Sequence, residues 1–108
     1  MRVFGGSDNI RDAWSPFGNG DMLERAMMIG YRANFRHDEE LALAFDMVTE
    51  TAADVLGING YGIAAGGPAD FVVVEAGSLA EAVASRPRRK LVVKAGRIVA
   101  KDGVLVLP

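Results

Sequence analysis

The sequence predicts a small α+β domain, because helical periodicity fills residues 21–57 and short apolar strands fill most of residues 61–108. Half of the 108 residues are apolar and 24% are charged, which is the composition of a globular chain rather than a disordered one. Residues 1–20 are rich in glycine and irregular. A chain of this length forms one domain or part of one.

The helical part begins at Asp21, a typical N-cap residue that is followed three positions later by Glu24 in the spacing of a capping box. Apolar residues at helical spacing predict one helix over residues 21–36 and further helical structure over residues 38–56. The last part of the second stretch is expected to form a short helix of its own. Gly57 ends it, because glycine is the preferred residue just after a helix.

The strands follow in the second half of the chain. Residues 71–74 form an apolar run bounded by turn residues, which predicts a buried strand. Ser78 is placed to cap a short helix. Residues 90–94 and 97–100 predict a hairpin, and the turn dipeptide Asp-Gly after them predicts a last strand over residues 104–107.

The irregular first part holds the candidate functional residues. Residues 2–4 predict a short strand, and a loop of about 13 residues follows it, which is long for so small a chain and typical of a functional loop. Asp8 lies just after this strand, where ligands bind in α/β proteins, although an aspartate in a turn often bonds only its own backbone. Trp14, the only tryptophan, is either a core residue or the wall of a pocket.

Other polar residues have simpler explanations. Asp12 and Asp21 could act with Asp8 as acid and base, but Asp21 is better explained as a helix cap and Asp12 as a solvated residue. The lone His37 between two predicted helices is typical of a helix end or a surface group. The basic cluster at residues 86–90 favours a solvated helix end over a phosphate site.

Composition excludes several classes of protein. With no cysteine and one histidine, the chain has no disulfides, no cysteine-ligated metal and no multi-histidine metal site of its own. A net charge of −2, one Trp and two Tyr argue against nucleic-acid binding. No apolar run approaches the roughly 18 residues that span a membrane, and the N-terminus lacks the pattern of a signal peptide. We therefore expect a cytoplasmic protein without membrane or nucleic-acid partners.

Four segments in order resemble one family. Residues 8–23 read DNIRDAWSPFGNGDML and resemble the segment after the last barrel strand of cytosine deaminase-like amidohydrolases, including hydrolases of isopropylammelide. Residues 51–57, TAADVLG, look like the closing helix of that family. Residues 61–74, YGIAAGGPADFVVV, look like its return into a small β-sandwich, and residues 93–100, VKAGRIVA, like a hairpin that ends many of these chains.

The resemblance implies a larger parent fold. Members combine a (β/α)8 barrel with an attached β-sandwich, and such a barrel needs about 250 residues. We therefore expect residues 1–60 to be the end of the barrel, with strand 8, the long active-site loop and helices. Residues 61–108 are expected to be the C-terminal part of the sandwich. The chain would be the last quarter to third of such an enzyme.

The resemblance also implies a chemistry. Asp8 matches the aspartate that binds the catalytic divalent metal, zinc or iron, and moves a proton during removal of an exocyclic amine from a pyrimidine or triazine ring. Trp14 matches an aromatic wall of the ring pocket, and Asn9 stands where some relatives have a second acid. The family's His ligands and catalytic Glu have no counterpart in the chain. We therefore expect this chain alone to bind no metal tightly and to be inactive.

Two other hypotheses remain beside this one. The chain is either part of such an enzyme or a stand-alone, non-catalytic module that kept the scaffold and uses its exposed edges for binding or assembly. A weaker possibility is that another polypeptide supplies the barrel. In each case, apolar helix faces and open sheet edges predict a homo-oligomer, with strand exchange as one route.

Overall fold

The structure, a computed structural model, describes residues 1–106. These residues form four α-helices and four β-strands. The helices are α1 (Met22–Ala33), α2 (Asp38–Met47), α3 (Glu50–Val55) and α4 (Leu79–Ser85). The strands are β1 (Phe71–Val74), β2 (Arg89–Lys94), β3 (Arg97–Lys101) and β4 (Val104–Leu105). Within these residues, no helix combines the length and the apolar composition that a membrane span requires.

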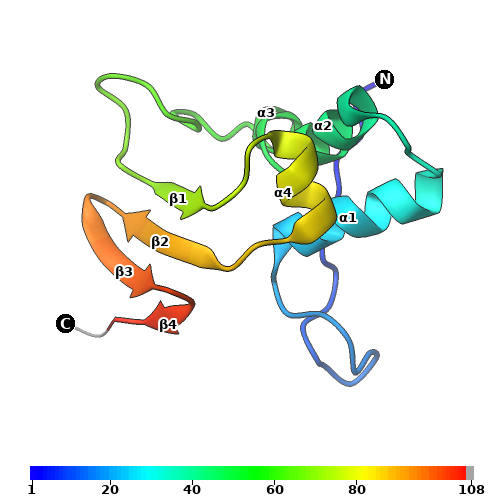
Figure 1. Ribbon diagram of the computed structural model, residues 1–108, viewed down its shortest axis with the longest axis horizontal. Helices are drawn as coiled ribbons and strands as arrows, with labels where there is room; N and C mark the ends of the chain where they lie inside the picture. Colours follow the sequence, from blue (N-terminus) through cyan, green and yellow to red (C-terminus); the bar gives the residue numbers. More distant parts are fainter. Residues whose placement is uncertain (107–108) are drawn as a thin grey trace.

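The molecule has a helical part and a sheet, placed side by side (Figure 1). The strands form one antiparallel sheet in the order β1–β2–β3–β4. Helix α4 follows β1 in the chain but packs on α1 and α2, so the polypeptide crosses to the helices and returns between β1 and β2. The predicted α+β class is therefore confirmed, with an antiparallel sheet.

The helix ends follow local sequence signals. Helix α1 ends at Ala33, three residues before the predicted end at residue 36, and Asn34 follows it in the left-handed conformation (φ 59°). The predicted Gly57 cap is confirmed: its φ is 71°, its N–H donates to the carbonyl of Asp54 (3.2 Å), and the N–H of Ile58 donates to that of Ala53 (2.9 Å). These two bonds form a Schellman motif, which satisfies the last free carbonyls of α3.

The predicted strand over residues 2–4 is wrong for this chain. The backbone there is irregular, and the N–H of Gly5 instead donates to the carbonyl of Met47 at the end of α2 (2.9 Å). A Cβ on Gly5 would approach the side chain of Ile29 to 2.7 Å, so this segment packs tightly on the helices. A strand exists only with a neighbour to pair with, and residues 1–106 provide none for this segment.

The core is built from small side chains. It consists of five alanines and three valines, and Val83 is the largest side chain that is fully buried. The accessible surface is 7866 Å², whereas a folded monomer of 11.5 kDa exposes about 5,800 Å². The chain therefore leaves roughly 2,000 Å² more surface open than a self-sufficient domain of its size.

The expectation that residues 71–74 form a buried strand is half right. The strand forms as β1 and pairs with β2, but Phe71, Val72 and Val73 are 36%, 50% and 42% exposed. An apolar strand at the edge of a sheet is normally covered or paired. Local sequence therefore specified the strand, whereas residues 1–106 do not supply the atoms that would bury it.

The predicted hairpins are confirmed within the described residues. Ala95 and Gly96 both have positive φ (51° and 76°) in the two-residue turn between β2 and β3. Asp102 and Gly103 (51° and 78°) do the same between β3 and β4. A two-residue hairpin turn of this type needs positive φ at both residues, because only then does its twist match that of the flanking strands. The predicted last strand is observed as Val104–Leu105, and its position 107 lies outside the described residues.

Asp70 fixes the connection before β1 to the first hairpin turn. Its carboxylate accepts hydrogen bonds from Nζ of Lys94 (2.6 Å) and from the N–H of Ala95 (2.7 Å). The N–H of Gly96 donates to the carbonyl of Ala69 (3.0 Å). The Lys94 hydrogen bond, followed by that from Ala95, lowers the pKa of Asp70 below its usual value.

We expect Asp70 to make the stability of the sheet depend on acid pH. Its pKa is lower in the folded than in the unfolded chain, so its stabilisation is fully present above the unfolded pKa and is lost as pH falls through the folded one. Asp70→Asn should flatten the pH dependence of the unfolding free energy in the acid range. A carboxyl NMR titration that places Asp70 at or above the ordinary aspartate pKa would contradict this prediction.

Candidate functional site

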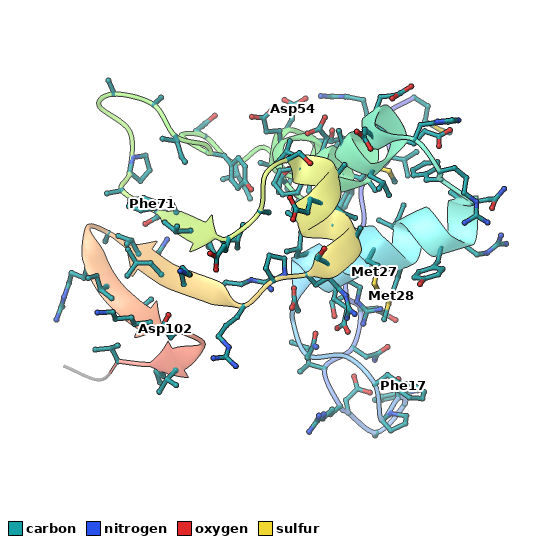
Figure 2. The ribbon with its side chains drawn as sticks, viewed as in Figure 1. Phe17, Met27, Met28, Asp54, Phe71 and Asp102 are labelled. Atoms are coloured by element: carbon teal, nitrogen blue, oxygen red, sulfur yellow. The ribbon has the colours of Figure 1, made fainter. Side chains whose placement is uncertain are left out.

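The candidate site is the loop over residues 5–20, which extends away from the helices before entering α1 (Figure 1). Figure 2 shows Phe17 toward its outer end, far from the sheet. The loop closes on itself, since the N–H of Arg11 donates to the carbonyl of Phe17 (3.0 Å). Gly18 (φ +95°) lies so close to the carbonyl of Asn9 that any side chain there would collide with it. The loop is therefore an ordered structure that requires glycine at this crossing.

Asp8 occupies an exposed bend of this loop. It has a positive φ of 60°, a conformation that Asp and Asn tolerate better than other residues with a side chain. The neighbouring backbone is held by Ser7: its hydroxyl donates to the carbonyl of Asn9 (3.0 Å), and its carbonyl accepts from the N–H of Asn9 (2.6 Å). The Asp8 carboxylate is thus presented to solvent by a constrained turn.

The hydrogen bonds at the centre of the loop converge on Asp12. One carboxylate oxygen, Oδ2, accepts from Nδ2 of Asn9 (2.5 Å). The other, Oδ1, accepts from the N–H groups of Trp14 (2.9 Å) and Ser15 (3.1 Å). The Asn9 amide and then the Trp14 N–H lower the pKa of Asp12. The interpretation of Asp12 as a merely solvated residue missed this role, although an aspartate that bonds N–H groups two and three residues later is a known turn signal.

Trp14 and Asn9, the two residues expected to contact the substrate ring, differ in exposure. Trp14 is 87% exposed, so within this chain it is not a core residue. Asn9 is half-buried, and its amide is engaged by Asp12. Both residues therefore bond one carboxylate, that of Asp12. Asp8 is linked to them only as the middle residue of the turn that the Ser7–Asn9 bonds close.

The loop is anchored where α1 begins. Asp21 caps α1 as predicted, accepting from the N–H of Glu24 (3.1 Å), but the reciprocal half of the capping box does not form. Asn19 replaces it: its Oδ1 accepts from the N–H of Asp21 (2.9 Å) and its Nδ2 donates to Glu24 (2.7 Å). Asp21 also forms an ion pair with Arg89, and Glu24 with Arg86 (3.4 Å).

These ion pairs also account for much of the basic cluster at residues 86–90. Arg86 and Arg89 pair with the start of α1, and Lys90 pairs with Glu75 (3.4 Å). Positive charges that already face carboxylates are poorly suited to bind phosphate. The structure therefore favours a structural role for this cluster. His37 lies apart from it, just before α2, where its N–H donates to the Glu40 carboxylate (3.0 Å).

The donor chemistry of Asp8 fits a divalent metal, because an exposed carboxylate is a suitable ligand for zinc or iron. Within residues 1–106, no three His, Cys, Asp or Glu side chains lie close enough together to hold a metal ion. A catalytic zinc usually takes three protein ligands. Asp8 can therefore provide one ligand, and the remaining ligands would have to come from outside the described residues.

A second feature is an apolar groove between the sheet and the helices. Its volume is about 710 Å³, and its walls come from α1, α2, α4, β1, β2 and the connection before β1. Residues 1–20 do not line it. The groove is therefore separate from the loop that holds Asp8, and it contributes to the unusually large exposed surface of the chain.

Comparison with known families identifies the class of protein to which this fold and this loop belong. The chain belongs to the amidohydrolase family, whose family model matches residues 1–100. This confirms the resemblance found in the sequence.

Two named enzymes are similar to nearly the whole chain. The N-isopropylammelide isopropyl amidohydrolase of Pseudomonas sp. (strain ADP) is 45% identical over 101 residues, which are 93% of this chain and 25% of that protein. The crystal structure of N-isopropylammelide isopropylaminohydrolase from Burkholderia multivorans superposes with a TM-score of 0.94 and 51% identity, over 98% of this chain and 27% of that chain. The chain thus spans about a quarter of the length of these relatives.

A deaminase also shares the fold. The structure of 5-methylcytosine deaminase from Klebsiella pneumoniae, liganded with 5-fluorocytosine, superposes with a TM-score of 0.85 and 27% identity. It matches all of this chain, which covers 26% of the deaminase. The arrangement of helices, loop and sheet in this chain is therefore the same as that of a portion of larger enzymes.

Proposed function

We propose that this chain is the C-terminal portion of a metal-dependent amidohydrolase that removes an exocyclic amine from a triazine or pyrimidine ring. The observation that supports this most strongly is the 45% identity to an N-isopropylammelide isopropyl amidohydrolase over 93% of the chain. Residues 1–60 would complete the barrel, and residues 61–108 would form part of the β-sandwich. The triazine substrate is favoured, because the ammelide hydrolases are more similar to this chain than the cytosine deaminase.

Within the assembled enzyme, Asp8 would ligate the metal and move the proton. A divalent metal, when bound, activates water for attack on a ring carbon. A carboxylate oxygen of Asp8 would take a proton from the attacking water as the new C–O bond forms. It would deliver this proton to the exocyclic nitrogen as the bond between that nitrogen and the ring carbon breaks. The amine leaves with that proton, and the ring keeps the oxygen. Trp14 and Asn9 would contact the ring and orient it.

In isolation, the chain would be inactive. It has one histidine and no cysteine, and that histidine, His37, lies at the start of α2 rather than in the loop with Asp8. Without further ligands, Asp8 would hold a metal weakly. Without the rest of the barrel, Trp14 would have no opposite wall against which to hold a ring.

The alternative is a non-catalytic module that binds or assembles through its open surface. The observation that favours it is the excess of roughly 2,000 Å² of exposed surface, together with the uncovered apolar edge strand β1. Self-association of the isolated chain is expected under both hypotheses. Activity in an assembled enzyme distinguishes them.

A chimera tests the proposed function. This chain would replace the matching 27% of the Burkholderia N-isopropylammelide isopropylaminohydrolase, to which it is 51% identical. We expect the chimera to release isopropylamine from N-isopropylammelide, and to do so faster than it releases ammonia from 5-methylcytosine. A chimera that folds, as shown by circular dichroism, but hydrolyses neither compound would support the non-catalytic module.

A further inference from the structure

Asp12 is the one side chain in the loop that bonds both proposed ring contacts. Its two carboxylate oxygens accept from the Asn9 amide (2.5 Å) and from the N–H groups of Trp14 (2.9 Å) and Ser15 (3.1 Å). The other contacts of this part of the loop, from Ser7 to Asn9, from Arg11 to Phe17 and at Gly18, involve the loop backbone and not the side chain of Asn9 or Trp14. The side chain of Trp14 is almost fully exposed, so packing does not hold it in place.

We propose that Asp12 is a positioning residue, which fixes Asn9 and Trp14 relative to one another so that they meet the ring of the substrate. This inference rests on the proposed function for the roles of Asn9 and Trp14. Asp12 does not touch the ring in this account. It orders the loop before the substrate binds, so the loop loses less conformational entropy on binding.

The hydrogen bond between Asn9 and Asp12 determines which way the Asn9 amide faces. An ionised carboxylate accepts hydrogen bonds and donates none, so Asn9 must turn its NH2 group toward Asp12. Its carbonyl oxygen is then left to face away from Asp12. Asn9 would therefore offer the substrate a hydrogen-bond acceptor, which suits a ring N–H or an exocyclic amine.

The donors around Asp12 also argue against a role as a base. Three hydrogen bonds stabilise its ionised form, and its pKa is lowered as a result. A carboxylate with a lowered pKa is a poor proton acceptor near neutral pH. The acid–base role considered for Asp12 from the sequence is therefore unsupported, and positioning remains.

Amide hydrogen exchange in the 108-residue chain tests the loop directly. Asp12→Ala should accelerate exchange of the Trp14 and Ser15 N–H groups about tenfold, as loss of a hydrogen bond to a charged acceptor implies. Asp12→Asn should retain most of the protection, because the oxygen of asparagine still accepts from both groups. Glu39→Ala and Glu39→Gln, in the first turn of α2, are matched controls that should leave these rates unchanged. Unchanged rates in Asp12→Ala would overturn the proposal.

Kinetics of the chimera separate positioning from a purely structural role. Asparagine at position 12 would present its own NH2 group to Asn9, so the Asn9 amide would have to flip and lose its acceptor toward the ring. Asp12→Asn should therefore raise KM about tenfold or more while the loop stays protected from exchange. An unchanged KM in this variant would overturn the proposal. A wild-type chimera without activity would instead contradict the proposed function.

Discussion

Replacing Asp8 with asparagine in the chimera is expected to lower the rate of amine release about a thousandfold or more. Asparagine has nearly the same shape but cannot take up a proton, and loss of acid–base catalysis alone typically costs 10²–10⁴ in rate. It is also a weaker ligand, since it has no negative charge. The measurement is kcat for isopropylamine release, together with metal content.

Asp102→Asn is the matched control for this variant. Asp102 also adopts a positive φ (51°, against 60° for Asp8), so both substitutions place asparagine in a backbone conformation that it tolerates. Asp102 lies in the turn between β3 and β4, on the sheet (Figure 2). We expect its variant to keep the full rate. A chimera with Asp8→Asn that retains a rate within about threefold of wild type would exclude Asp8 from the catalytic site.

The isolated chain is expected to self-associate. Burying the excess surface of two copies would remove up to roughly 4,000 Å², which lies in the range of obligate dimers. Light scattering at tens of micromolar should therefore give a mass of at least twice 11.5 kDa. The exposed edge strand β1 is the strongest candidate for the contact, because its four residues are all apolar and one of its edges is unpaired.

Val73→Lys tests whether that edge is used. A lysine on an edge strand opposes pairing with another strand, so the variant should shift the mass toward that of a monomer. Val104→Lys places the same charge on β4, at the other edge of the sheet, and should leave association through β1 intact. A wild-type chain that remains a monomer of 11.5 kDa across the concentration range would contradict the prediction.

Features set by neighbouring residues were predicted well from the sequence. The Asp21 cap and the Gly57 stop depend on hydrogen bonds within a few positions, and both form as expected. The turns at residues 95–96 and 102–103 follow the same rule, because each needs only two residues that adopt positive φ. The order of elements and the α+β class follow from these local features.

Features that depend on distant atoms were not predicted. The strand expected at residues 2–4 and the burial expected for residues 71–74 both require partners that the described residues do not provide. The bonds to Asp12 are different, because they join residues only two or three positions apart and were missed although Asp12 carries a local turn signal. The sequence singled out Asp8, Asn9 and Trp14 in this loop and treated Asp12 as solvated.

The metal content of the isolated chain and of the chimera tests the central claim, that this chain supplies one part of a divided active site. Each protein would be dialysed against buffered zinc or iron(II), and bound metal measured by mass spectrometry. We predict less than about a tenth of an equivalent in the isolated chain, about one in the chimera, and a reduced value with Asp8→Asn. Close to one equivalent in the isolated chain would contradict the account, because the ligands would then be assembled without the rest of the enzyme.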